Sequence, residues 1–116
     1  MKIVPIDQVP NEPVAMAGAK DVCRQLVLSQ ADGCPTFSFR VFTIAPGGHT
    51  PYHTHACEHL NYVISGAGCL VEEGGEEHEL GEGDFALVLP EEKHQYRNVS
   101  ADEPFRMICA VPKEYE

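Results

Sequence analysis

The chain has 116 residues, a length typical of one domain, and its 18 acidic against 8 basic residues give a formal net charge of -10. An acidic chain repels the phosphates of nucleic acids and of anionic membranes, so neither is expected as a partner. No apolar run reaches the length of a membrane span, and the early Pro5 leaves no room for the core of a signal peptide. We therefore expect one cytoplasmic domain over residues 1–116.

Short segments rich in β-branched and aromatic residues, each ended by Gly, Pro or Asn, predict strands. The first two are 22–28 and 36–44, and turn-forming residues 45–48 are expected to end the second. A short extended piece follows at 52–55. Further strands are predicted at 60–64, 70–71, 78–80, 85–89 and 105–111. No segment has convincing helical periodicity, so the sequence predicts an all-β sandwich or barrel.

The segment Glu73-Gly74-Gly75-Glu76 predicts a two-residue hairpin turn between the strands at 70–71 and 78–80. The five cysteines form no Cys-x-x-Cys pair, which disfavours a zinc ribbon or a thioredoxin-like site. They are expected to be reduced thiols in a reducing compartment.

Four of the six histidines have the spacing of metal ligands, namely His53, His55, His59 and His94. Residues two apart in a strand share a face, so His53 and His55 should point together. His59 follows after three residues, enough to turn a corner, and His94 must come from a distant strand. Imidazole suits Mn, Fe, Co, Ni, Cu and Zn, so the four residues predict a transition-metal site.

Alternation extends this site into a pocket. If His59 and His94 point inward, Asn61 and Tyr96 should do the same. In the last strand, Phe105 and Val111 bracket an apolar face that is expected to point into the barrel. The pocket candidates are Thr50 at the rim, Asn61, Tyr96, Met107 and Cys109. For Met107, plain core packing is favoured over contact with a substrate.

Other polar residues near these motifs have simpler interpretations. His49 and His78 are interpreted as surface residues, Cys57 as a small corner residue and Glu58 as a solvated neighbour of the ligands. Asn98 is expected to fix a turn.

The spacing of these residues resembles the two motifs of the cupin family. The first motif, Gly-x5-His-x-His-x3-Glu-x6-Gly, is similar to residues 47–66, through Gly47, His53, His55, His59 and Gly66. The second is similar to residues 83–98, through Gly83, Pro90, His94 and Asn98. The chain departs twice: His59 replaces the usual glutamate, and Glu92 replaces a usual glycine, with one residue fewer in the spacing. The first departure is shared with small single-domain cupins that have a four-histidine site.

The resemblance implies a double-stranded β-helix, a jelly-roll barrel of two antiparallel sheets, with one divalent metal in its interior. Mn or Fe is favoured, with Ni, Zn, Co or Cu as alternatives. Six-coordinate Mn or Fe on four histidines would keep two open positions for dioxygen, water or a chelating substrate. A homodimer is expected, and an N-terminal strand that pairs with a partner's sheet edge is one route to it.

Three functions stay open, all with a small molecule as ligand or substrate. The first is a metal-dependent oxidoreductase of dioxygenase type. The second is a non-catalytic binding module that holds a small ligand through the metal. The third is an isomerase or decarboxylase in which the metal acts as a Lewis acid. The motifs do not choose among them, because one fold hosts many chemistries.

Overall fold

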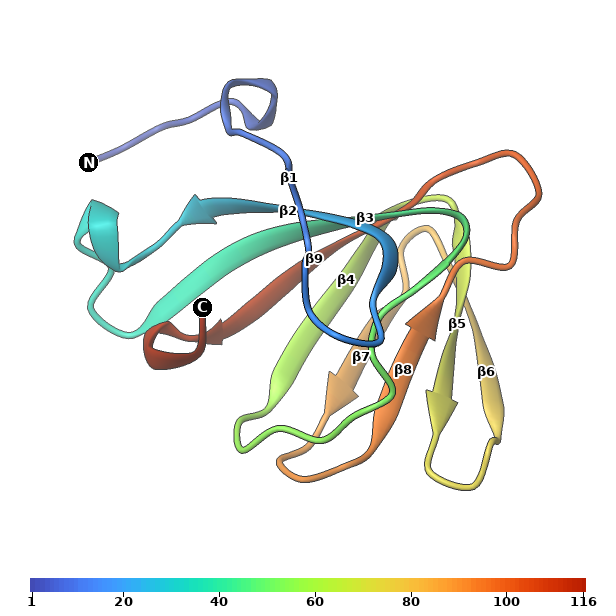
Figure 1. The fold of residues 1–116 in the computed structure, drawn as a ribbon. Helices are drawn as coiled ribbons and strands as arrows, with labels where there is room; N and C mark the ends of the chain where they lie inside the picture. The colour runs from blue at the N-terminus through green and yellow to red at the C-terminus, as the bar shows by residue number, and fades with distance from the viewer.

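The computed structural model describes residues 1–116 and consists almost entirely of β-strands (Figure 1). The strands are β1 (Glu12–Pro13), β2 (Lys20–Leu28), β3 (Phe37–His49), β4 (His59–Ser65), β5 (Ala67–Glu72), β6 (Glu77–Gly81), β7 (Phe85–Val88), β8 (His94–Arg97) and β9 (Phe105–Pro112). The remaining regular elements are three single turns of 3-10 helix, at Ile6–Gln8, Gln30–Asp32 and Lys113–Tyr115. The predicted all-β class is confirmed, and each predicted strand overlaps an observed one. The short extended piece at 52–55 contributes only an isolated bridge, between His53 and His94.

The strands form a curled antiparallel sheet in the order β6-β5-β8-β3-β9-β4-β7, with β2 also paired to β3 and β1 to β2. The curl gives two layers (Figure 1). One layer contains β2, β3, β9, β4 and β7, and the other contains β8, β5 and β6. This is the jelly-roll barrel of two antiparallel sheets that was expected.

Strand β3 belongs to both layers, because the predicted turn at 45–48 does not end it. β3 pairs with β9 as far as Ile44 and reaches β8 at His49, opposite Arg97. Its register with β2 shifts between these positions, and Gly47 has a positive φ of 77°. Glycine adopts this conformation without strain, so the residues form a bend inside the strand and not a turn after it.

The predicted hairpin between β5 and β6 is present, but its loop is longer than expected. Glu72 N donates to Glu76 O at 2.8 Å, which leaves three residues, 73–75, in the loop. Gly74 and Gly75 have φ values of 99° and 89°, a region that favours glycine. The two glycines make the turn as predicted. The loop is closed by Glu72 and Glu76, whereas a two-residue loop would be closed by Glu73 and Glu76.

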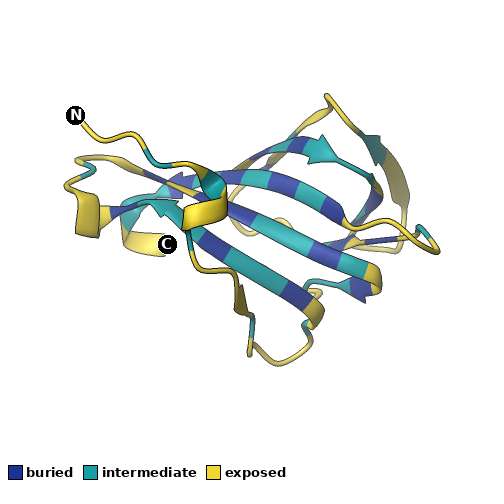
Figure 2. Cartoon of the chain, turned by 90° about the horizontal axis from the view of Figure 1, so that it is seen from above, coloured by how far each residue is buried: buried dark blue, intermediate teal, exposed yellow.

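The core lies between the two layers, and buried residues alternate with less buried ones along the strands (Figure 2). In β9 the predicted inward face is confirmed, since Phe105, Met107, Cys109 and Val111 are all buried. The core cluster consists of Val22, Ile44, Val63, Val88, Tyr96, Phe105 and Met107. No helix in the structure is long and apolar enough to cross a membrane.

The outer face of β3, β9, β4 and β7 is also apolar. One row of paired residues crosses these four strands as Phe39, Ala110, Leu60 and Leu87. The next row continues from Val41 through Ile108 and Tyr62 to Phe85. Phe85 is 80% exposed, and Leu87, Leu60 and Phe39 are each about half exposed. We call these two rows the outer apolar face.

Candidate metal centre

The four predicted ligands come from two segments that the backbone ties together. His53 and His55 lie in the connection from β3 to β4, whereas His59 opens β4 and His94 opens β8. His53 N donates to His94 O at 3.1 Å, and His94 N donates to His53 O at 3.0 Å. A further bond runs from Glu91 N to His55 O at 2.9 Å. Backbone hydrogen bonds alone therefore place His53 and His55 beside His94, which is distant in sequence.

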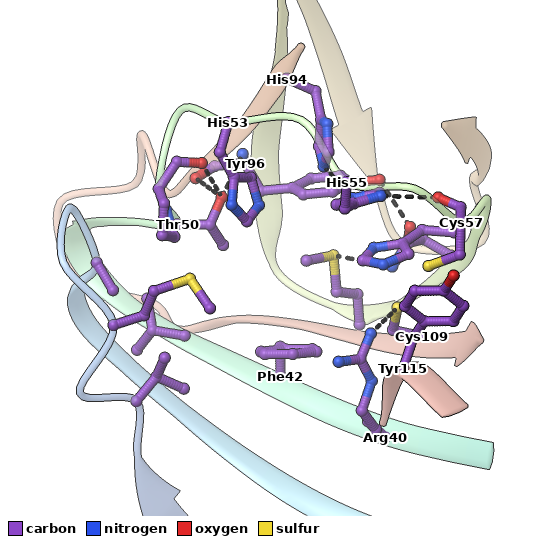
Figure 3. A pocket seen from close by; sticks show the side chains of 18 residues that line it. Arg40, Phe42, Thr50, His53, His55, Cys57, His94, Tyr96, Cys109 and Tyr115 are labelled. Atoms are coloured by element: carbon purple, nitrogen blue, oxygen red, sulfur yellow. Dashed lines mark hydrogen bonds between the residues drawn. The ribbon is translucent and has the colours of Figure 1, made fainter. Parts of the chain in front are cut away.

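Figure 3 shows the rings of His53, His55 and His94 close together at the cavity, and His59 lines the same cavity. His55 lies centrally: its ring centroid is 4.6 Å from that of His94, 5.5 Å from that of His53 and 3.6 Å from that of the stacked His59. The ligand atoms of His53, His55 and His94 lie within 4.8 Å of one another. His55, Cys57 and His59 form a second such group. The structure thus shows two overlapping groups that share His55, and not one set of four.

The hydrogen bonds of the rings fit a bound cation. His55 Nδ1 lies 2.7 Å from Cys57 O, and His94 Nδ1 lies 2.9 Å from Glu92 O. A carbonyl oxygen only accepts, so each Nδ1 carries a proton, and in neutral imidazole Nε2 then presents its lone pair. The two Nε2 atoms face each other at 3.1 Å. Two ligand atoms at right angles, each about 2.1 Å from one metal ion, lie about 3 Å apart.

Burial keeps three of these rings neutral. Desolvation lowers the pKa of His59 from 6.5 to about 3 and the pKa of His94 to about 4. The pKa of His53 is also lowered, first by desolvation and then by the neighbouring His55. The neutral ring is the form that binds metal, so the donors are ready at neutral pH.

The histidines line a cavity of about 190 Å³ in the barrel interior (Figure 3). All five pocket candidates from the sequence line it as well: Thr50, Asn61, Tyr96, Met107 and Cys109. The histidines and these residues come from β4, β8, β9 and the connection after β3. More than half of the lining, 10 of 18 residues, is hydrophobic.

Asn61 and Tyr96 satisfy each other inside this cavity. Tyr96 Oη donates to Asn61 Oδ1 at 2.8 Å, and both residues are buried. Burial raises the pKa of Tyr96 well above its usual value, so its hydroxyl remains a donor. Thr50 Oγ1 accepts from Tyr96 N at 2.9 Å and so fixes β8 to the segment that carries His53.

Several lining residues were not found from the sequence: Val14, Met16, Ala19, Val22, Arg40, Phe42, Pro51, Cys57 and Tyr115. Arg40, Phe42 and Ile44 are each two residues apart and share the inner face of β3, so the alternation that indicated Asn61 could also have indicated Arg40 and Phe42. No sequence signal brings in Val14 to Ala19 or Tyr115, because these lie outside the strands.

Arg40 is buried, with 6% of its surface exposed. Its side chain makes one hydrogen bond, from Nη2 to Cys109 Sγ at 3.0 Å, and its Nε has no acceptor. The guanidinium carbon lies 5.0 Å from the centre of the Phe42 ring. Desolvation raises the pKa of the Cys109 thiol, so Cys109 remains a neutral acceptor.

The secondary interpretations have mixed outcomes. Asn98 fixes a turn as predicted: its Nδ2 donates to Glu103 O at 2.7 Å and to Ile44 O at 2.9 Å. Cys57 is buried and lines the cavity, which is more than the corner role that the sequence indicated. His78 is on the surface as expected, 3.4 Å from Glu72.

Comparisons with known proteins agree with this architecture. Residues 40–111 match the family model described as Cupin domain. The structure of the polyketide cyclase RemF from Streptomyces resistomycificus superposes with a TM-score of 0.91 and 30% identity, over 97% of this chain and 79% of that one.

Two curated enzymes are similar in sequence. The L-ectoine synthase of Mycolicibacterium gilvum (strain PYR-GCK) is 30% identical over 104 residues, which are 89% of this chain and 76% of the synthase. The (R)-mandelonitrile lyase of Granulicella tundricola (strain ATCC BAA-1859 / DSM 23138 / MP5ACTX9) is 38% identical over 52 residues, 45% of this chain and 40% of the lyase. From the family match, the jelly-roll barrel and the histidine cluster in its interior, we conclude that the chain belongs to the cupin family.

Proposed function

We propose that this cupin is an enzyme that binds one divalent transition metal through His53, His55, His59 and His94. The metal would supply Lewis acidity to a small substrate in the barrel, for ring closure, elimination or isomerisation. The observation that carries the proposal is the pair of Nε2 lone pairs of His55 and His94, which face each other at 3.1 Å. Two acceptors repel at this distance unless a cation or a proton lies between them.

The other residues of the cavity would bind and orient the substrate. The hydrophobic lining, which includes Phe42 and Met107, excludes water from much of the cavity. The Tyr96 hydroxyl holds its proton at Asn61 Oδ1 and fixes the Asn61 amide, whose Nδ2 points toward Ile108 O at 3.4 Å. These contacts fix the Tyr96 and Asn61 side chains in the cavity lining, which favours a defined substrate orientation.

The names of the relatives support non-oxidative chemistry. A polyketide cyclase and a mandelonitrile lyase are named for ring closure and for elimination. Neither name denotes net oxidation. A Lewis-acid role, the third function considered from the sequence, therefore ranks first.

A dioxygenase-type oxidoreductase is the second candidate, because a ligand set of imidazoles alone leaves positions open for dioxygen on Mn or Fe. A non-catalytic module that holds a small ligand through the metal is the third. Oxygen dependence separates the first two: Lewis-acid turnover continues under strict anaerobiosis, and dioxygenase turnover stops. Saturable binding without any product would favour the module.

The first experiment is elemental mass spectrometry of protein purified without an affinity tag. We expect about one equivalent of a divalent transition metal, lost in His53→Ala and retained in the matched control His78→Ala, which changes an exposed histidine outside the site. Mn or Fe is our first expectation, and Ni, Zn, Co or Cu would still agree with the ligand set. A folded protein that binds none of these metals would overturn the proposal.

We also propose a homodimer that pairs two outer apolar faces. Within one chain β1 pairs with β2, and pairing of the N-terminal strand with a partner's sheet edge stays a prediction. Phe39, Leu60, Leu87 and Phe85 of the outer apolar face are 46% to 80% exposed, so this face offers apolar surface toward the roughly 800 Å² per chain that a stable dimer buries. Its two rows contain no charged residue, so two acidic chains can meet there without opposing like charges.

The cytoplasm remains the proposed compartment. All five cysteines are free, which suits a reducing environment.

A further inference from the structure

Arg40 is the one side chain of the cavity lining with a permanent charge. The lining contains no Asp, Glu or Lys, and no ion pair joins Arg40 to any acid of the chain. The guanidinium group stays protonated in proteins, so it cannot escape burial by losing its proton. A buried charge without a counterion is costly in free energy. A buried arginine without an acidic partner therefore indicates that the cavity binds an anionic ligand.

No group of the protein fills that role. Cys109, which accepts the single hydrogen bond of the Arg40 side chain, is neutral. The Glu116 carboxylate lies near the same end of β3, but it accepts from Ser38 Oγ and from Gln30 N at 3.2 Å. The remaining N–H donors of Arg40 have no acceptor within the chain.

Arg40 is also held in a fixed orientation. Phe42 supports the guanidinium from one side at 5.0 Å, and Cys109 fixes Nη2. In Figure 3 the guanidinium group is directed into the cavity, across from His53 and His94. A planar fork that is held in this way matches a carboxylate better than a rounder anion.

The rest of the cavity suits an apolar body attached to that carboxylate. Its volume of about 190 Å³ exceeds the roughly 150 Å³ of a cavity known to hold benzene. Phe42, Met16 and Met107 supply apolar surface to the lining of the same cavity.

We infer that Arg40 anchors the substrate by its carboxylate, and that the cavity takes small organic carboxylates with an apolar body of about one ring. This rests on the proposed function only for the identity of the site, because the anion would bind Arg40 whether or not metal is present. It extends the proposed function by naming the substrate class and a binding residue that the histidine motifs do not indicate.

The test is calorimetric binding of benzoate, both to the protein as purified and to chelator-treated protein. Benzamide, a neutral analogue of nearly the same shape, and inorganic phosphate are the comparison ligands. We expect benzoate to bind in both preparations and more tightly than either comparison ligand. Arg40→Met should weaken benzoate binding roughly tenfold to hundredfold, the range for loss of a charged hydrogen bond, and should leave benzamide unaffected.

The matched control is Arg106→Met, which removes a charge from β9 outside the cavity and should leave benzoate affinity unchanged. Equal affinity in Arg40→Met and the parent, no benzoate binding by the parent, or phosphate binding as tight as benzoate binding would each overturn the inference. Because the chelator-treated arm needs no metal, these results are independent of the metal analysis that tests the proposed function.

A second measurement protects against a variant that does not fold. The Nε–H signal of Arg40 can be followed by nitrogen-15 NMR in the unmodified sequence and assigned by its disappearance in Arg40→Lys. We expect benzoate to shift this signal more than benzamide does. An unmoved signal at saturating benzoate would contradict the anchor.

Discussion

The hydrogen bond between Tyr96 and Asn61 stabilises the wall of the cavity at the scale of single residues. Both groups are buried, and Tyr96→Phe would leave Asn61 Oδ1 without its donor at 2.8 Å. We expect the free energy of unfolding to fall by about 1–3 kcal/mol, the cost of an unsatisfied buried acceptor. Urea unfolding followed by circular dichroism measures it.

Tyr52→Phe is the matched control. Tyr52 Oη also donates to a carbonyl, that of Glu72 at 2.5 Å, but water can replace this bond because the residue is exposed. Its loss should change the free energy of unfolding by less than about 0.5 kcal/mol. Equal costs for the two variants would contradict the importance of burial.

The buried histidines make the stability of the metal-free protein depend on pH. The pKa of an unfolded histidine is 6.5, whereas the folded values are about 3 for His59 and about 4 for His94. Between these limits the unfolded chain binds more protons, so the free energy of unfolding is highest above pH 6.5 and falls as the pH is lowered toward 4. Urea midpoints measured in chelator across this range should show the decline.

His59→Gln and His94→Gln should each flatten that decline, because each removes one of the groups responsible. The quantity to compare is the slope of the free energy of unfolding against pH. Its absolute value is not informative, since either substitution also changes packing. If both variants kept the parent's slope, burial of these two rings would not be its cause.

The histidines could be found from the sequence, whereas Arg40 was missed, and the difference has a physical reason. Ligand residues are recognised by type and spacing alone, as the two segments with His53 and His94 illustrate. An arginine in a strand is normally read as outward-facing. Only the face that Arg40 shares with Phe42 and Ile44 places it inside, and its lack of an acidic partner is visible only in the complete cavity.

At the scale of elements, most strands were predictable, whereas β1 and the bend in β3 were not. Composition and turn residues located most strand centres, including the alternating face of β9. Residues 45–48 have the chemistry of a turn, but both ends of the segment are held by pairing, to β9 before it and to β8 after it. Tertiary pairing of this kind lies beyond local sequence signals.

Gly68 in β5 shows how closely the two layers approach. A Cβ atom there would lie 2.4 Å from the ring of Phe105, which is fully buried in β9. Gly68→Ala should therefore lower the free energy of unfolding by about 1–3 kcal/mol through overpacking, measured by thermal or urea unfolding. Gly81→Ala is the control, because its Cβ would meet only the Asp84 carboxylate at 3.9 Å. A neutral Gly68→Ala would mean that the Phe105 ring moves aside freely.

At the scale of the whole molecule, the outer apolar face predicts self-association. Leu60 lies at its centre, between Ala110 and Leu87, and is 49% exposed, so Leu60→Glu should fold. Burial of two glutamates against each other is unfavourable, so this variant should sediment as a monomer where the parent sediments as a dimer. Val99→Glu, at an exposed loop position, should leave the dimer intact. A monomeric parent at micromolar concentration would contradict the prediction.

The backbone bonds between His53 and His94 have a consequence for the kinetics of metal uptake. The two amide–carbonyl bonds, at 3.0 and 3.1 Å, hold both ligand segments in place without an ion. A preorganised site has no slow rearrangement to wait for. Uptake by stripped protein should therefore speed up in proportion to metal concentration, without reaching a plateau rate, as stopped-flow absorbance with Co²⁺ would record. The ion would then enter between two ligand segments that folding has already placed side by side.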